Sequence, residues 1–312
     1  MDKKELVQKF FKGRAVPRPP FLPLVGTYLT KVDQVSIPSI LQDANTFYSA
    51  LVNTQKLLGY DAIILPLDPS LEAEAFGGTV VWMDQEMPKV IEVPFSQELL
   101  SSDFLESGRL PVVKEVVERL VKVQGKELPI IATISGPVTI IKTLYGEDIT
   151  SDIGLMKNRA SQITQEMIGL CKAFGDAKVD GILINEGQLD SALWEECKDI
   201  YKPLFNVIKF YNIFGILRFS SDINSIESTN HLPDIVLGSQ DFITNTSVKN
   251  KGVAFLPSIW EETMDLSQLA LLWKENKKRR MFLSSSQPLD IDINLTELQE
   301  KTSIICNEES WQ

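Results

Sequence analysis

Short apolar runs alternate along this chain with longer segments in which apolar residues recur at helical spacing. Most of the short runs are continuously apolar, which is typical of parallel strands with both faces buried. The pattern predicts eight strands, at Phe21–Gly26, Asp61–Leu67, Pro129–Ser135, Asp180–Asn185, Asn206–Ile213, Asp234–Ser239, Gly252–Ser258 and Met281–Ser285. It predicts helices between them, among which are Asn45–Leu58, Leu110–Val123, Leu155–Phe174 and Glu261–Glu275.

The order of these elements predicts the fold. Eight strand–helix units within 312 residues favour an α/β protein, a (β/α)8 TIM barrel, with residues 1–312 forming a single domain. A doubly wound open sheet is the alternative, but no glycine-rich phosphate loop follows a strand to support it. Two additions are expected: a short N-terminal helix over residues 1–13 and a hairpin-like excursion after the second strand over residues 79–94.

Charge and cysteine content narrow the class of protein. The net charge is −11 and the pI is about 4.8, which argues against nucleic acid as a partner because phosphate binding needs clustered Lys and Arg. The three cysteines are widely spaced and odd in number, which fits a reducing compartment better than a disulfide framework. The chain shows neither a signal-peptide core nor an apolar run of roughly 20 residues. We therefore expect a soluble, cytoplasmic protein without a membrane partner.

Carboxylates gather where the predicted strands end, and a (β/α)8 barrel carries its reactive groups at those ends. Asp68 ends the second strand, Glu72 and Glu74 follow it, and Glu186 ends the fourth. Asp68 and Glu72 could instead cap the following helix, and two acids two residues apart cannot share one helix face. A charge after an apolar strand is costly unless it faces a cavity or a partner. We therefore take Asp68, Glu186 and Glu74 as the catalytic candidates and expect Glu72 to serve structure.

Aromatic and amide side chains complete the expected barrel mouth. The candidates for substrate binding are Tyr28, Tyr145, Asn212, Phe214 and Gln287. Neither a histidine nor a cysteine is among the strand-end residues. Such a mouth suits acid–base work on a neutral or cationic small molecule, because a carboxyl group raised toward neutrality by burial can protonate a leaving group.

Several stretches, in the same order, resemble the uroporphyrinogen decarboxylase superfamily. They are RPPFLPLVGTY, GYDAIILPLDPSLEAEAFGG, MPKVIEVPF, PIIATISGPVTIIKTLYGED, VDGILINEG and RRMFLSSSQPLDIDINLTEL. The similarity spans residues 15 to about 300. Within this superfamily the acidic EAEAFG is most similar to corrinoid-dependent methyltransferases of the methylcobalamin:coenzyme M type. The resemblance implies a (β/α)8 barrel, in agreement with the strand count.

The resemblance also implies a reaction and a partner. It implies methyl transfer between a small-molecule donor or acceptor and the corrinoid of a separate carrier protein. In such a system a buried carboxyl group would assist removal of the methyl from a donor such as an aryl methyl ether. Methyltransferases of this branch bind zinc through a His-x-Cys pair ending the fifth strand and a Cys after the eighth. The corresponding residues here are Asn212, Phe214 and Gln287, which are poor zinc ligands. We therefore expect carboxylates and amides at the mouth in place of a zinc ion that activates a thiol.

Other readings of the same residues stay open. Carboxylates could hold a metal through oxygen ligands, or acids and amides could bind a pterin-like ring. A decarboxylase of the uroporphyrinogen type is a further alternative, because Asp68 falls where those enzymes carry their key aspartate. Thr27 stands where that branch would place an arginine. A barrel that only binds a ligand or a carrier protein, without catalysis, is the alternative from another class.

Overall fold

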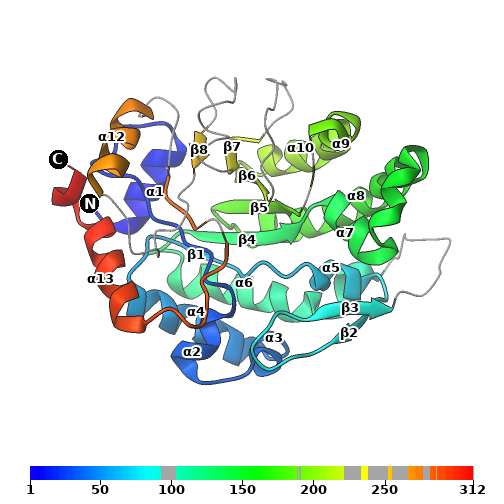
Figure 1. Ribbon diagram of the computed structural model, residues 1–312, viewed down its shortest axis with the longest axis horizontal. Helices are drawn as coiled ribbons and strands as arrows, with labels where there is room; N and C mark the ends of the chain where they lie inside the picture. Colours follow the sequence, from blue (N-terminus) through cyan, green and yellow to red (C-terminus); the bar gives the residue numbers. More distant parts are fainter. Residues whose placement is uncertain are drawn as a thin grey trace.

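The computed structural model describes residues 1–92, 103–187, 189, 191–220, 233–237, 252–254, 266–276, 282–285 and 287–311. At its centre, parallel strands pair in the order in which they follow along the chain (Figure 1). They are β1 Ile63–Ile64, β4 Ile130–Ser135, β5 Gly181–Glu186, β6 Phe214–Phe219, β7 Ile235–Leu237 and β8 Gly252–Ala254. Parallel neighbours need a connection that returns to the same end of the sheet, and helices supply it where the connections are described.

Two further segments lie beside these strands in the part of the chain that the structure describes. Phe21 and Leu283 form a parallel bridge, in which the amide of Leu22 donates to the carbonyl of Leu283 at 2.7 Å. The carbonyl of Phe21 accepts from the amide of Asp61 at 3.0 Å, just before β1. The eight strand segments thus follow one another as in a (β/α)8 TIM barrel, and the predicted fold class is confirmed.

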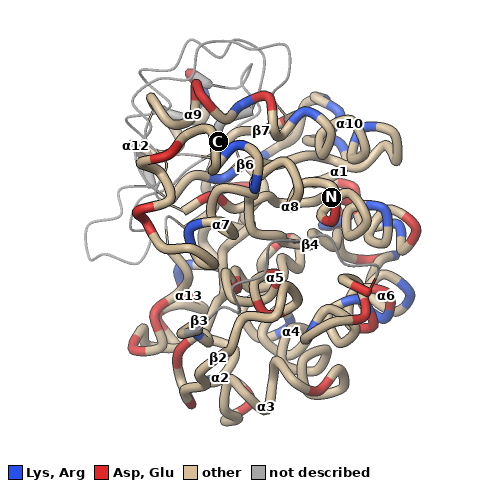
Figure 2. Tube along the Cα trace, turned by 90° about the vertical axis from the view of Figure 1, so that its right-hand side faces the viewer, with Lys and Arg blue, Asp and Glu red and all other residues tan. Residues whose placement is uncertain are grey.

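Helices surround the sheet (Figure 1), and their outer faces carry charges of both signs, as along α6 in Figure 2. The α-helices are α1 Lys3–Phe11, α2 Leu29–Asp33, α3 Ile37–Leu41, α4 Ala44–Leu58, α5 Ser70–Ala75, α6 Leu110–Gln124, α7 Pro137–Tyr145, α8 Ile153–Asp176, α9 Ser191–Cys197, α10 Lys202–Phe210, α12 Leu266–Asn276 and α13 Leu295–Cys306. The predicted N-terminal helix is α1, and α4, α6, α8 and α12 correspond to the four helices predicted from periodicity; residues 261–265 lie outside the described residues.

The strands are apolar on both faces because each face meets a different part of the core. Ile131, Leu183 and Ile216 belong to a cluster inside the barrel, together with Phe10 and Phe11 of α1. The neighbouring residues, such as Ile130 and Ile182, belong to the cluster between sheet and helices.

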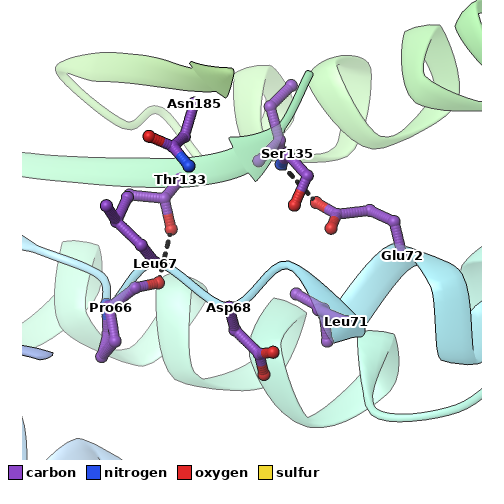
Figure 3. A pocket seen from close by; sticks show the side chains of 9 residues that line it. Pro66, Leu67, Asp68, Leu71, Glu72, Thr133, Ser135 and Asn185 are labelled. Atoms are coloured by element: carbon purple, nitrogen blue, oxygen red, sulfur yellow. Dashed lines mark hydrogen bonds between the residues drawn. The ribbon is translucent and has the colours of Figure 1, made fainter. Parts of the chain in front are cut away.

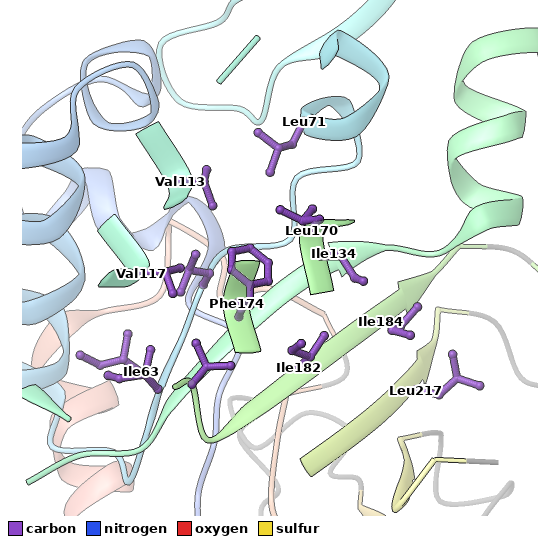
Figure 4. Packing of buried hydrophobic residues seen from close by; sticks show 14 of the residues in the cluster. Ile63, Leu71, Val113, Val117, Ile134, Leu170, Phe174, Ile182, Ile184 and Leu217 are labelled. Carbon is purple, nitrogen blue, oxygen red and sulfur yellow. The ribbon is translucent and has the colours of Figure 1, made fainter. Parts of the chain in front are cut away.

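Figure 4 shows that second layer, in which Val117 of α6 and Phe174 of α8 pack near Ile63 and Ile182. Phe10 and Phe11 of helix α1 lie in the inner cluster, so α1 closes the amino end of the barrel. A site can therefore form at the carboxyl end.

The prediction for the fifth strand is wrong. Residues expected to form the strand Asn206–Ile213 belong mostly to helix α10, which carries Pro203 at its start. Leu204, Phe205 and Ile208 are buried on one face of it, which is helical spacing. Asn212 follows with a φ of 58°, the left-handed conformation common just after a helix. The strand of this unit, β6, therefore begins only at Phe214.

The hairpin excursion after the second strand is confirmed. Strands β2 Thr79–Val81 and β3 Lys89–Glu92 pair antiparallel, and they lie beside α5 in Figure 1. Among the described helices, none combines the length and the apolar character needed to cross a bilayer.

Candidate active site

The inner face of the barrel changes from apolar to polar toward the carboxyl ends of its strands. Side chains alternate along a strand, so Thr133 and Ser135 share the inner face with Ile131. Asn185 on β5 and Arg218 on β6 follow the inward-facing Leu183 and Ile216 in the same way. The polar end of the barrel is therefore built from residues that the strand pattern directs inward.

A small cavity lies at this polar end, between α5 and the ends of β4 and β5 (Figure 3). Its volume is about 10 Å³, comparable to the space that one water molecule needs. The residues that line it are Pro66, Leu67, Asp68, Leu71, Glu72, Thr133, Ile134, Ser135 and Asn185. Two carboxyl groups, an amide and two hydroxyl groups thus share one cavity.

Glu72 is the least solvated of these acids. It lies on α5 and is 1% exposed, and its Oε1 accepts a hydrogen bond from the amide of Ser135 at 2.9 Å. Its Oε2 is buried, and no group in the part of the chain that the structure describes forms a hydrogen bond with it. Burial raises the pKa of Glu72 to about 7, a rise that the bonds from Ser135 partly oppose and the charge of Asp68 assists. Near neutral pH, both the protonated and the ionised form of the Glu72 carboxyl group are therefore populated.

Asp68 is held in an ion pair beside Glu72. Its Oδ2 accepts from Nη1 of Arg109, and its Oδ1 accepts from the amide and the hydroxyl of Ser70 at 3.0 and 2.6 Å. Nε of the same arginine donates to Oε2 of Glu74 at 2.6 Å, and Nη2 donates to the Ser70 hydroxyl at 2.8 Å. Arg109 thus joins two of the three predicted catalytic acids into one network.

Local backbone geometry places Arg109 in this network. Gly108 precedes it with a φ of +54°, and a Cβ at Gly108 would meet Cγ of Glu74 at 3.0 Å. A side chain at that position would be strained and crowded. Trp82, which follows β2, covers the guanidinium of Arg109 at 4.8 Å from its ring centre. The hairpin excursion therefore packs directly on the charged network.

Glu186 lies at the end of β5, as predicted, but its contacts favour a capping role. It is fully buried and accepts from the amides of Val138 and Thr139 at the start of α7, at 3.2 and 2.9 Å. The hydroxyl groups of Thr139 and Tyr201 also donate to it. Burial raises the pKa of Glu186, and these donors oppose the rise. A Cβ at Gly136 would lie 1.9 Å from its Oε1, so glycine there makes room for the carboxylate.

The predicted substrate-binding residues are scattered. Tyr28 is buried, and its hydroxyl donates to the carbonyl of Ile293 at 3.2 Å. Tyr145 ends α7 and lies under the guanidinium of Arg159. Gln287 is exposed and follows the last strand segment, the end of the barrel where it was expected.

Asn212 and Phe214 lie at the opposite end from the mouth, which corrects their prediction as mouth residues. Asn212 precedes β6 and Phe214 begins it, so both are at the amino end of the strand. The Phe214 ring stacks on Phe11 of α1 at 3.8 Å. The carboxyl end of this strand instead carries Arg218, whose Nη1 donates to Asn185 Oδ1 at 2.6 Å and to the Ser220 hydroxyl at 2.8 Å. Burial lowers the pKa of Arg218 to about 10.

Sequence reasoning did not identify Arg109 or Arg218 as site residues, although the sequence around each of them indicates a buried partner. Arg109 stands at the N-cap of α6, where the helix dipole disfavours a cation, so a carboxylate partner could have been inferred. Arg218 is a lone cation in an apolar strand, which implies buried polar partners. Glu72 leaves no comparable signal, because most of α5 around it is buried too.

The fold and this polar cavity define a (β/α)8 barrel with an acid–arginine mouth, and comparison with known proteins gives its family. The chain belongs to the uroporphyrinogen decarboxylase (URO-D) family, whose sequence model matches residues 2–182. The resemblance inferred from the motifs is therefore confirmed, and the matched region contains Asp68, Glu72 and Arg109.

Curated relatives at low identity are methyltransferases. The methylcobamide:CoM methyltransferase MtbA of Methanosarcina acetivorans is 26% identical over 152 residues, which cover 46% of this chain and 45% of that protein. A methylated-thiol–coenzyme M methyltransferase of Methanosarcina mazei is 29% identical over 139 residues, covering 43% and 38%. The matched regions thus span less than half of the length of these relatives.

Solved structures support the fold over almost the whole chain. A methyltransferase from Methanosarcina mazei superposes with a TM-score of 0.75 at 17% identity, covering 97% of this chain and 98% of that one. A B12-independent methionine synthase from Shewanella sp. W3-18-1 gives a TM-score of 0.53 at 15% identity, covering 92% and 94%.

The described residues do not fit the zinc centre that the resemblance implies. The end of β6 reads Arg218-Phe219-Ser220 and carries neither His nor Cys, and a guanidinium is not a metal ligand. Cys171 and Cys197 are buried in or at the end of helices, and burial raises the pKa values of their thiols to about 12 and about 11. Within the described ranges, no group of three or more His, Cys, Asp or Glu could hold a metal ion.

Proposed function

We propose that this protein transfers a methyl group between a small molecule and the cobamide of a separate corrinoid carrier protein. The observation that carries the proposal is the similarity to methylcobamide:CoM methyltransferases, within a family whose match covers Asp68, Glu72 and Glu74. The cobamide reaches the site on its carrier protein, which docks over the carboxyl ends of the strands, where barrel enzymes hold their reactive groups.

The mouth supplies acid–base chemistry for this transfer. Arg109 fixes Asp68 and Glu74 as a rigid charged wall beside the cavity, and Ser135 and Asn185 face the same space. A carboxyl group with a raised pKa, such as Glu72, can protonate the oxygen of a departing group. A methyl ether of a phenol is therefore a suitable donor, because its leaving oxygen is basic enough to need a proton.

The other predicted residues contact the substrate or position the elements around the site in this proposal. Gln287 contacts substrate at the outer rim. Glu186 positions α7 and the end of β5 through its four donors, so its predicted catalytic part is indirect. Tyr28 and Tyr145 shape the elements around the mouth.

A barrel that only binds a ligand is the second candidate, and one contact favours it. Asp68 is neutralised by Arg109, as expected for a structural acid. Glu72 argues the other way, because an unpaired oxygen in a buried carboxyl group costs stability and is kept only where it serves a purpose.

The test follows the absorption spectrum of the corrinoid. Cob(I)alamin is mixed with the protein and a panel of methyl ethers and methyl thioethers, and methylcobalamin is mixed with thiols, tetrahydrofolate and phenols. The proposal predicts conversion with at least one class at a rate proportional to protein concentration. No protein-dependent conversion in either direction would overturn it and favour the binding-only barrel.

A further inference from the structure

We infer that Glu72 is the residue that moves the proton in this site, giving it to the substrate atom that loses the methyl group. The inference rests on the proposed function and names the acid that carries it out. None of the three predicted catalytic acids, Asp68, Glu74 and Glu186, donates this proton.

One carboxyl oxygen of Glu72 is available to a substrate. Its Oε1 is fixed by the amide of Ser135 at 2.9 Å, while Oε2 is buried and has no hydrogen-bond partner among the described residues. Figure 3 shows this carboxyl group at the cavity, between α5 and the end of β4. Buried polar atoms nearly always have a partner in a folded protein. An orphaned carboxyl oxygen on a cavity is therefore the place where a substrate atom would complete the bond.

The other three acids are already engaged. Both oxygens of Asp68 accept bonds from Ser70 or Arg109. Glu74 accepts from Arg109, and its side chain is 21% exposed. Glu186 accepts from four donors and does not line the cavity.

The electrostatic environment also favours Glu72. Asp68 lies close enough for its charge to raise the pKa of Glu72 further, after burial has raised it. Two neighbouring carboxyl groups in different environments, one ion-paired and one desolvated, form the usual arrangement for assigning an acid. At neutral pH a large fraction of Glu72 carries a proton while Asp68 faces a guanidinium.

Asn185 supplies a second contact for the same substrate atom. Arg218 donates to its Oδ1 at 2.6 Å, which assigns the oxygen and leaves the NH₂ group as the donor of this cavity-lining amide. A substrate oxygen could then accept from Asn185 and from the protonated Glu72 together.

The step balances with a methyl ether as donor and a reduced corrinoid as acceptor. The bond from the methyl carbon to the ether oxygen breaks, and its electron pair stays on that oxygen. Cobalt(I) of the carrier's corrinoid supplies the pair for the new bond to the methyl carbon and is formally oxidised by two electrons. The proton moves from Glu72 Oε2 to the departing oxygen, which leaves as the free phenol. Solvent then reprotonates Glu72.

The experiment compares Glu72→Gln with the wild type on a series of aryl methyl ethers whose phenols have pKa values from about 7 to about 10. Cob(I)alamin is the acceptor, and Glu115→Gln, on the exposed face of α6, is the matched control. For the most basic phenol we expect kcat/KM of Glu72→Gln to fall by about 10²–10⁴-fold, the usual contribution of general acid catalysis. For the most acidic phenol the loss should be far smaller, and the control should match the wild type.

The wild type alone gives a second readout that does not depend on a folded variant. Its kcat/KM for the most basic phenol should fall above about pH 7, as Glu72 loses its proton, and should stay flat for the most acidic one. An equal loss across the series, or a pH profile that does not depend on the phenol, would overturn the inference and leave the proposed function standing. No transfer from any aryl methyl ether by the wild type would also overturn the inference. The proposed function would fall only if methyl thioethers, thiols, tetrahydrofolate and phenols gave no conversion either.

Discussion

Replacing Glu72 by Gln should make folding stability less dependent on pH. The pKa of Glu72 rises to about 7 in the folded state from 4.5, so the folded protein holds this proton more tightly than the unfolded chain does. Stability from this group is therefore fully present below about pH 4.5 and is lost as the pH rises through about 7. At about 1.4 kcal/mol per pH unit, ionised Glu72 costs about 3 kcal/mol. Gln cannot ionise, and its oxygen can still accept from the amide of Ser135.

Urea unfolding at a series of pH values measures this effect. Between about pH 4 and about pH 8, the wild type should lose about 3 kcal/mol more of its free energy of unfolding than Glu72→Gln does. Glu115→Gln, at an exposed helix position, should follow the wild type. Parallel curves for the wild type and Glu72→Gln would show that Glu72 ionises normally, and the acid–base account of the cavity would then be refuted.

Three further experiments test other parts of the structure. Arg109→Met should destabilise by about 3–5 kcal/mol because it leaves two acids without their partner, whereas Arg119→Met should cost less than about 1 kcal/mol; equal effects in urea unfolding would contradict the network. Glu186→Gln should cost about 1–3 kcal/mol, since an NH₂ group would then face donors, and Gly136→Ala should cost a similar amount by displacing Glu186; a stability unchanged in both would exclude the cap. Metal analysis of the purified protein should find well below one equivalent of zinc, and a full equivalent would show that other residues supply its ligands.

Much of the barrel could be predicted because its strands are buried on both faces. Runs such as Ile130–Ser135 are buried at every position and largely apolar for that reason, and the helices between them keep their period. The fifth unit failed because Val207 and Ile208 look like strand residues, while Pro203 and Asn212 mark the ends of a helix. Because of that error, Asn212 and Phe214 were predicted at the carboxyl end of the barrel, and Arg218 was not recognised as a residue of the mouth.

The site could be predicted only as far as the strand ends identify it. Glu186 ends β5 and Asp68 comes after β1, but the roles of both acids depend on contacts that no local pattern contains. Arg109 lies 41 residues from Asp68, and Glu186 meets α7 through residues 47 and 48 positions away. Glu72 is the proposed acid because it is buried and one of its oxygens has no hydrogen-bond partner among the described residues. Both are properties of the tertiary structure, which no local sequence pattern shows.

The most direct test of the account is the absorption spectrum of cob(I)alamin mixed with the purified protein and a methyl donor. The account predicts that the spectrum of methylcobalamin grows in at a rate proportional to protein concentration, and that aryl methyl ethers are donors. An unchanged spectrum with every methyl ether and methyl thioether, together with stable methylcobalamin in the presence of thiols, tetrahydrofolate and phenols, would contradict it.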